Sequence, residues 1–357
     1  MKLADLTLDD RFIPFRESYG ISSAAFTGET FLVARLTCED GSTGLADSVN
    51  AVPFGPESPA TMREVLVSHL MPAIRGLDPR DTALIAARME AAIPGHPMAK
   101  AVIDIACHDL AARAAGLPLW RHLGGAHRTE VSFAGSVGIS TTERMEAEAA
   151  DFVARGARTV KVKIGTDPTT DLDRVRAIRA AIGPGINLRL DANQGCRLAD
   201  WLPTCRKMEA CDPEFLEQPL PVWDIAGTAR LVEALDTPIL IDEGIYTAHD
   251  LMALIRAGAV GAVNIKLLKT GLTGARDLAA IARAADLPIV VGSMFETGIG
   301  TAASLHFAAT LPGPLACTEI GFPTKLTEDV LPASPYLDSP AGFTWPCPTS
   351  AGLGVSF

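Results

Sequence analysis

The chain has 357 residues, of which 48% are hydrophobic and 20% charged, and its formal net charge is −11. This length can bury a large core and favours more than one domain. The acidic balance and the lack of a basic run argue against nucleic acid or an anionic membrane as a partner. No run of 18 apolar residues and no secretion signal appear, and the seven cysteines fit neither a zinc motif nor a disulfide framework. We therefore expect a cytoplasmic protein with reduced thiols.

The first part of the chain predicts a mixed unit. Residues 1–50 are typical mainly of strands, and residues 17–30 within them are mostly polar or small. We expect these residues to form a mobile loop, because loops of this length often cover binding sites. From Pro59 to Ala115 the apolar spacing becomes helical. A domain boundary is predicted near residue 125.

The second part alternates between strands and helices. The candidate strands are 130–137, 158–164, 187–192, 213–217, 238–242, 261–266, 288–293 and about 315–319. The candidate helices between them are Thr142–Arg155, Asp171–Ile182, Ile225–Leu235, Ala248–Ala257 and Gly274–Ala285. Eight strands alternating with helices predict a parallel α/β barrel. We expect three parts: 1–125, a barrel at 126–325, and a C-terminal segment, 326–357, that returns to the first part.

Acidic residues recur where the predicted strands end. Asp191 and Asn193 lie two apart and so share one strand face. Glu217 follows Asp191 by 26 residues, and Asp242 follows Glu217 by 25. These steps are close to the length of one parallel crossover unit. The three acids would therefore meet at one end of neighbouring strands, where their oxygens suit a hard cation such as Mg²⁺.

Lysines end the strands on either side of these acids. Lys161 and Lys163 share a face of one strand, and Asn264 and Lys266 share a face of another. A later strand runs towards Glu296. In a closed barrel, the two lysine strands would face each other across the acids.

Each of these residues also has a structural interpretation. Asp191 alone is better explained as a helix N-cap, and Glu296 could cap the helix that starts near Gly298. Lys269 fits an ordinary loop lysine, and Glu243, next to Asp242, is expected to point the other way. The recurrence at near-equal spacing makes the structural interpretations improbable as a set.

The motifs in this order resemble the enolase superfamily and, within it, the muconate lactonizing enzyme subgroup of the mandelate racemase/muconate lactonizing enzyme family. The barrel motifs are Lys161-Val162-Lys163, Asp191-Ala192-Asn193, Glu217-Gln218-Pro219, Asp242-Glu243, Asn264-Ile265-Lys266 and Gly292-Ser293-Met294-Phe295-Glu296. The stretch Ala99-Lys100-Ala101 with Asp104 and Asp109, and Leu123-Gly124-Gly125, resemble the family's capping domain. The resemblance implies a (β/α)7β-type TIM barrel with an N-terminal α+β capping domain, and oligomerisation of identical chains.

The resemblance also implies roles for the strand-end residues. Asp191, Glu217 and Asp242 would bind Mg²⁺, with Mn²⁺ as an alternative. Lys163 and Lys266 would act on opposite faces of the carbon α to a substrate carboxylate, an arrangement in keeping with the lysine or histidine bases of enolase-superfamily sites. Lys161 would assist by lowering the pKa of Lys163. Substrate contacts would come from Asn193, Asn264, Met294 and Glu296, and the segments at 17–30 and 49–56 would set specificity.

The lysine pair does not select one reaction. Two opposed lysines suit a racemase or epimerase of an amino-acid derivative, and one active lysine would suffice for cycloisomerisation of a muconate-like acid. A lyase that removes water, as in o-succinylbenzoate synthesis, is the alternative within enzymes. A barrel that binds small acids without turning them over is the alternative outside them. In every case the expected partner is a small-molecule carboxylate.

Overall fold

The computed structural model describes residues 1–52 and 55–356. Its first elements are β1 (Leu3–Gly20), β2 (Ala25–Cys38), β3 (Thr43–Val49), α1 (Pro59–Val65), η1 (Leu66–Leu70), α2 (Met71–Ile74), α3 (Thr82–Ala92), α4 (Pro97–Ala114) and α5 (Leu119–His122). The next are β4 (Glu130–Ser132), β5 (Gly135–Val137), α6 (Thr142–Ala154), β6 (Thr159–Lys163), α7 (Pro168–Ile182), β7 (Asn187–Asp191), α8 (Leu198–Met208), η2 (Glu209–Cys211) and β8 (Pro213–Glu217). The last are α9 (Ile225–Ala234), β9 (Ile239–Ile241), α10 (Ala248–Ala257), β10 (Ala262–Lys266), α11 (Leu267–Ala284), β11 (Ile289–Gly292), α12 (Gly298–Thr310), η3 (Phe322–Lys325) and β12 (Thr344–Pro346).

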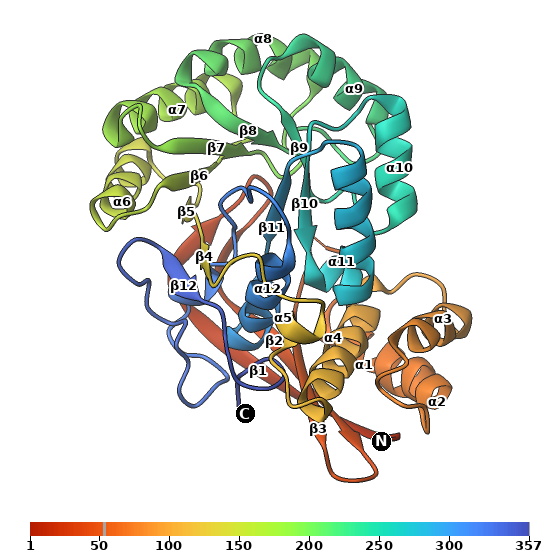
Figure 1. Cartoon of the computed structure of the whole chain (residues 1–357). Coiled ribbons are helices and arrows are strands. Elements are labelled where there is room, and N and C mark those ends of the chain that lie inside the picture. The colour runs from red at the N-terminus through yellow and green to blue at the C-terminus, as the bar shows by residue number, and fades with distance from the viewer. Residues whose placement is uncertain (53–54, 357) are drawn as a thin grey trace.

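Strands β1, β2 and β3 form an antiparallel sheet, and the first helices lie beside it (Figure 1). Helix α4 is buried along almost its whole length because it packs against β3, α3 and α11. Its Asp109 accepts hydrogen bonds from the backbone of Leu45 (3.0 Å) and of Leu353 (2.7 Å). One buried carboxylate thus joins the capping sheet to the end of the chain.

The predicted barrel is confirmed. Seven parallel strands form one curved sheet in the order β11-β10-β9-β8-β7-β6-β5, with helices α6 to α11 on its outer side (Figure 1). The eighth position is held by two residues only: Thr318 bridges Phe133, and Glu319 bridges Gly292, both in parallel. The predicted strand at 315–319 is therefore reduced to a pair of bridges that close the sheet. The fold is a TIM-barrel type with an N-terminal capping domain.

The strand register places the polar ends at one level. Lys163 pairs with Asp191, and Asp191 pairs with Glu217. Asp242 directly follows β9, and Lys266 ends β10. Parallel strands buried on both faces are built mainly from apolar runs. Besides the strand ends, buried polar residues lie within the strands at Lys161, Arg189 and Asn264.

The prediction of a mobile loop at residues 17–30 is wrong for most of that range. Strand β1 continues to Gly20 and β2 begins at Ala25, with Tyr19 paired to Phe26. The polar residues alternate along a long hairpin, and alternation of this kind is a property of half-exposed strands. The Ile21–Ala24 turn carries the tip of this hairpin to the barrel. Of the other specificity segment, 49–56, residues 53–54 lie outside the described residues.

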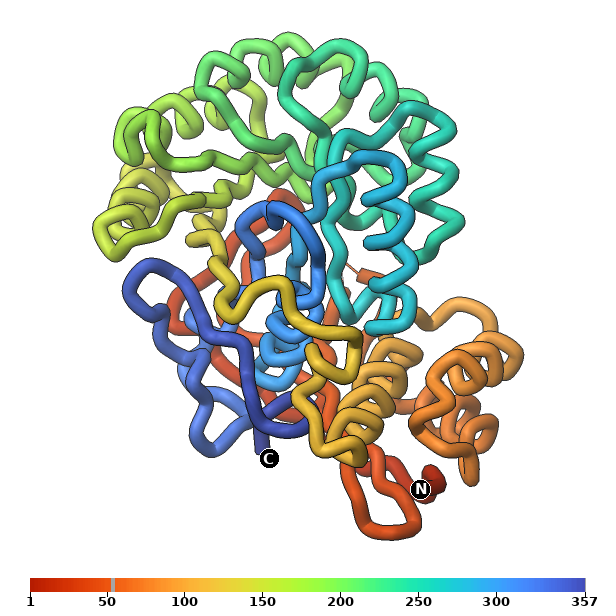
Figure 2. Tube along the Cα trace, in the orientation of Figure 1, coloured from red at the N-terminus to blue at the C-terminus, as the bar shows by residue number. Residues whose placement is uncertain are grey.

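The C-terminal segment lies along the first part of the chain, where Figure 2 shows it running beside the connection from α5 to β4. Strand β12 pairs with β4, Leu119 donates to the carbonyl of Gly352 (2.9 Å), and Trp120 Nε1 donates to that of Pro348 (2.8 Å). The domain limits at 125 and 325 stay predictions. Within the described residues, no helix combines the length and apolar character needed to cross a membrane.

Candidate active site

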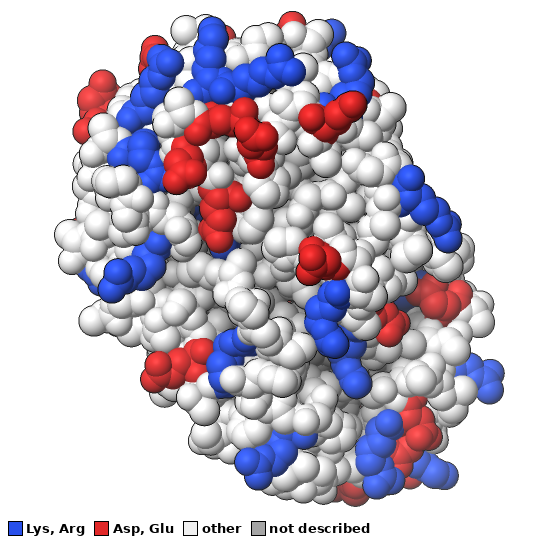
Figure 3. All heavy atoms as spheres, turned by 45° about the horizontal axis from the view of Figure 1, so that its top comes forward, with Lys and Arg blue, Asp and Glu red and all other residues white. Residues whose placement is uncertain are grey.

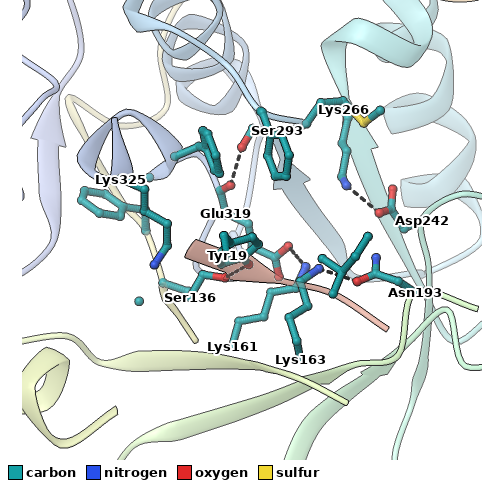
Figure 4. Close-up of a pocket in the computed structure, with 18 of the residues that line it drawn as sticks. Tyr19, Ser136, Lys161, Lys163, Asn193, Asp242, Lys266, Ser293, Glu319 and Lys325 are labelled. Atoms are coloured by element: carbon teal, nitrogen blue, oxygen red, sulfur yellow. Dashed lines mark hydrogen bonds and ion pairs between the residues drawn. The ribbon is translucent and has the colours of Figure 1, made fainter. Parts of the chain in front are cut away.

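A pocket opens at the carboxyl ends of the barrel strands, and the predicted lysines line it (Figure 4). Lys161 and Lys163 enter from β6, and Lys266 enters from β10. The sheet order sets the three acid-ended strands β7, β8 and β9 between those two lysine strands. The residues that were predicted from spacing are therefore brought together at one mouth.

Lys163 holds the end of β7. Its Nζ donates to Asp191 Oδ2 at 2.6 Å and to Asn193 Oδ1 at 2.7 Å. Asn193 has a positive φ of 40°, so the chain leaves the extended conformation directly after the strand. The two side chains point together as predicted, onto one lysine, although Asn193 lies beyond the strand, where the alternation of faces no longer applies.

Lys266 mirrors this arrangement on the other side. Its Nζ donates to Asp242 Oδ2 at 2.5 Å. Lys269, expected to be an ordinary loop lysine, is instead only 2% exposed, and its Nζ donates to the backbone oxygen (2.5 Å) and Oδ1 (2.9 Å) of Asp242. Helix α11 begins directly after β10, so its first turn folds Lys269 back onto the site. The correction follows from the early helix start, which spacing did not indicate.

Lys161 is surrounded by carboxylates. Its Nζ lies 2.9 Å from Asp191 Oδ2, 2.7 Å from Glu217 Oε2 and 2.5 Å from Glu319 Oε2. Sequence reasoning missed Glu319, although it ends the eighth predicted strand just as the other acids end theirs. Buried Arg189 holds the second oxygen of Glu319 at 3.1 Å. Glu319 is therefore fixed from both sides.

The charges of these groups control one another. Burial would lower the pKa of Lys163, but Asp191 raises it above its usual value. The prediction that Lys161 depresses the pKa of Lys163 is therefore not met overall, although the charge of Lys161 does lower that pKa. Burial would raise the pKa of Asp191, yet Lys161 and Lys163 lower it to about 2. Burial, with Asp191 and Glu319 as neighbours, raises the pKa of Glu217 well above its usual range.

Glu243 was predicted to point away from the site, but it lines the pocket. Its Oε1 accepts from Asn193 Nδ2 at 3.0 Å. Burial and the neighbouring Asp242 raise its pKa to about 7. Strand β9 ends at Ile241, so the alternation of strand faces no longer applies to Glu243.

The predicted substrate contacts occupy different positions. Met294 and Asn193 line the pocket. Asn264 is 1% exposed and donates to Glu217 Oε1 at 2.9 Å. Glu296 is also 1% exposed, and its Oε2 accepts from Ser304 at 3.3 Å. Their positions favour a supporting role for Asn264 and Glu296, and substrate contact by any of the four stays a prediction.

The donor set of Asp191, Glu217 and Asp242 fits a hard divalent cation. As the side chains lie, no group of three His, Cys, Asp or Glu residues within 1–52 and 55–356 is gathered to hold a metal ion, and lysine ammonium groups lie against the carboxylates instead. The three acids are nevertheless buried carboxylates at level, neighbouring strand ends. Glu217 Oε2 is without a hydrogen bond of normal geometry among the described residues. Oxygen-only donors of this kind are the ligands that Mg²⁺ takes.

The rest of the pocket is largely aromatic. Phe295 stacks on Phe322, with ring centroids 4.3 Å apart, and Tyr19 meets both rings edge-on. Phe152 and Lys325 complete this part of the lining. On the outer surface, by contrast, acidic and basic side chains are interspersed over the face seen in Figure 3.

A capped barrel with lysines facing each other across acid-ended strands defines an enolase-type fold and site. The chain accordingly matches the N-terminal domain model of the mandelate racemase/muconate lactonizing enzyme family over residues 9–124 and the enolase C-terminal domain-like model over 144–357. It belongs to the mandelate racemase/muconate lactonizing enzyme family of the enolase superfamily. Its relatives in this family are isomerases.

Similarity to individual members extends over almost the whole chain. The L-Ala-D/L-Glu epimerase of Bacillus subtilis is 32% identical over 92% of this chain and 90% of its own. The chloromuconate cycloisomerase of Cupriavidus necator is 31% identical over 99% of this chain and 96% of its own. The crystal structure of a dipeptide epimerase from Enterococcus faecalis, complexed with Mg and the dipeptide L-Leu-L-Tyr, is 30% identical, covers 100% of both chains and gives a TM-score of 0.94.

Proposed function

We propose that this isomerase removes the proton α to the carboxylate of an amino-acid derivative and returns it on the opposite face. The product would be the racemised or epimerised substrate. The observation that carries this proposal is the placement of Lys163 and Lys266 on the two sides of the three acid-ended strands. A substrate carboxylate held over the acids would present its α-carbon between two lysine ammonium groups.

The chain's own residues would handle the proton. One of the two lysines, in its neutral form, would take the α-proton, and the other, as an ammonium, would donate to the far face. Loss of the proton leaves an enediolate, and Lys161 contributes a buried positive charge beside the carboxylates. For the reverse direction the two lysines exchange roles.

Asp191, Glu217 and Asp242 would hold Mg²⁺, with Mn²⁺ as an alternative. A bound Mg²⁺ supplies positive charge that stabilises the negative charge developing on the substrate carboxylate. Its charge would also counter that of Asp191 and Asp242, the groups that raise the pKa values of Lys163 and Lys266. A lysine pKa nearer to neutrality is what proton abstraction requires.

Cycloisomerisation is the second candidate, because the similarity to a chloromuconate cycloisomerase extends over 99% of the chain. Syn dehydration of a hydroxy acid and binding without turnover stay as alternatives. We infer further that the protein works in the cytoplasm as an assembly of identical chains, on a small-molecule carboxylate and without nucleic acid or membrane. The domain limits at 125 and 325 belong to the same proposal.

The reactions are separated by incubating the protein with Mg²⁺ in D₂O and candidate acids, each followed by mass and by NMR. Racemisation incorporates one deuteron at the α-carbon and inverts the centre without changing the carbon skeleton. Cycloisomerisation forms a ring, and dehydration lowers the mass by one water. Turnover of muconates or hydroxy acids with no α-exchange in any amino-acid derivative would refute the proposal.

A further inference from the structure

Lys325 is a fifth lysine in the pocket, and it lies on the side away from Lys266 (Figure 4). It ends η3, just after the bridges that close the barrel. Its Nζ lies 5.1 Å from the ring centroid of Tyr19 and 5.5 Å from that of Phe152. Aromatic faces hold a cation by attraction to the ring quadrupole, so they fix the position of this ammonium without neutralising it.

The ammonium of Lys325 keeps unused donor capacity. A lysine has three N–H donors. Within the described residues, one bond is recorded for them, to Glu148 Oε1 at 3.2 Å. The side chain of Glu148 is 29% exposed and that of Lys325 20%, and ion pairs this open to water are weak. An incoming anion could therefore share the ammonium with Glu148.

A neutral donor lies between Lys325 and the catalytic lysines. Tyr19 Oη and Ser136 Oγ are 2.6 Å apart, and both residues line the pocket (Figure 4). One hydroxyl hydrogen makes the bond between them, and the second is left to donate elsewhere. A carbonyl oxygen in this part of the pocket would accept it.

Lys325 also differs from the other lysines of the pocket in its partner. The other four, Lys161, Lys163, Lys266 and Lys269, each pair with a buried carboxylate of the strand ends, whereas Glu148, the partner of Lys325, is open to water. A second negative charge on a ligand would therefore find, at Lys325, an ammonium that no buried carboxylate already neutralises.

We propose that Lys325 binds a second anionic group of the substrate, at the end remote from the α-carbon. The Tyr19–Ser136 pair donates to a neutral carbonyl between the two charges. The substrate is thus an N-acyl amino acid or dipeptide that carries a second carboxylate beyond its amide. This inference rests on the proposed function, whose substrate class it narrows.

The test compares two ligands that differ only in the distal charge, N-succinyl-L-leucine and its succinamoyl analogue, in which a carboxamide replaces the far carboxylate. Exchange of the α-proton in D₂O gives kcat and KM for each. The expected KM of the dianion is about tenfold lower, the usual scale of one charge-assisted hydrogen bond. Lys325→Met is expected to bring the two KM values together, and Lys325→Arg to keep them apart.

Glu148→Gln is the matched control. It removes the negative charge that competes for Lys325 but leaves the ammonium unchanged, so discrimination between the two ligands is expected to persist or increase. Equal loss of discrimination in Glu148→Gln and Lys325→Met would mean that the ion pair merely supports the wall, and would overturn the inference.

Failure of the inference differs from failure of the proposed function. Exchange with no preference for the dianion would overturn the role of Lys325 and leave proton abstraction intact. If neither compound exchanges, equilibrium dialysis of the same two compounds against parent and Lys325→Met protein still decides. Tighter dianion binding that depends on Lys325 would then support the anion site, and equal binding would refute it.

Discussion

Lys163 and Lys266 lie on opposite sides of three acid-ended strands, and each is bound to the outermost acid on its own side. Lys163 Nζ is 2.6 Å from Asp191 Oδ2, and Lys266 Nζ is 2.5 Å from Asp242 Oδ2. Each lysine is thereby held extended at the level of the strand ends. This symmetry about Glu217, on the central strand of the three, is the arrangement that the proposed removal of a proton from either face of a substrate requires.

Mg²⁺ is expected to stabilise the folded protein. Glu217 lies buried near two other carboxylates, and a cation among them would relieve that crowding. With Mg²⁺ at about 100 times its Kd, linkage predicts about 2.7 kcal/mol of added stability. Thermal unfolding with Mg²⁺ and with EDTA measures it. Glu217→Gln should abolish most of the difference, whereas Glu143→Gln, on the exposed face of α6, should not. An equal response in both variants would place the metal elsewhere.

Lys269→Met is expected to destabilise the fold by about 2–4 kcal/mol, because breaking a buried pair leaves a charge with too few partners. Lys269 supplies two of the hydrogen bonds of Asp242. Urea unfolding gives the change. Lys100→Met is the comparison: Lys100 pairs with Glu90, which is 68% exposed, and should cost less than about 1 kcal/mol. Similar costs for both would show that Lys269 does not hold the site.

Gly271→Ala is expected to impair both folding and turnover. Gly271 has φ +65°, and a Cβ there would lie 2.6 Å from Asp104 Oδ2, which caps the second part of α11 through Leu272 N. The strained backbone alone costs about 1–3 kcal/mol, because a φ of 65° with a ψ of 177° is a conformation almost restricted to glycine. Gly271 has a non-helical backbone and kinks α11, which starts directly after Lys266, so the kink follows the turn that carries Lys269. Gly274→Ala, in ordinary helix with its nearest neighbour atom at 3.4 Å, should stabilise by up to about 1 kcal/mol. The free energy of unfolding and kcat are measured for both glycine variants and compared with those of the parent protein.

Asp47 predicts a pH-dependent stability. Burial raises its pKa to about 7. A Cβ added to Gly300 would contact the side chains of both Asp47 and Glu296, so these two side chains are neighbours. Because the folded pKa is above the unfolded value of about 4, the folded state holds a proton that the unfolded state releases. Stability is therefore lost as pH rises from about 4 to about 7. Asp47→Asn keeps an acceptor for Thr297 and removes this loss.

The two proteins should differ least in stability at pH 4, where most of this loss has not yet occurred. At pH 8 the Asp47→Asn variant should be more stable, by an amount on the order of 4 kcal/mol. Calorimetric unfolding at the two pH values provides the measurement. A variant less stable than the parent at pH 8 would show that the charged form of Asp47 is needed.

Much of the barrel and of the candidate site could be predicted from spacing. Equal steps between Asp191, Glu217 and Asp242 reflect one repeated strand-and-helix unit, and a parallel register then places their ends at one level. Lysines two apart on one strand point to the same face, so Lys161 and Lys163 meet in the pocket.

The remainder depended on where regular structure begins and ends. Lys269 enters the site because α11 starts directly after β10, and Glu243 because the chain turns after β9. Both are properties of backbone conformation at a junction, where the periods of strand and helix give no guidance. The hairpin that brings Tyr19 to the pocket was obscured by polar residues on its exposed face.

The most direct test of proton abstraction by two lysines is α-proton exchange in D₂O with each enantiomer of a turned-over N-acylamino acid. Lys163→Ala and Lys266→Ala should each lower racemisation about 10²- to 10⁴-fold, the usual scale of acid–base catalysis. Each variant should still exchange one enantiomer, and a different one. Lys207→Ala, at an exposed position, should match the parent for both. Exchange of both enantiomers that survives loss of either lysine would contradict the account.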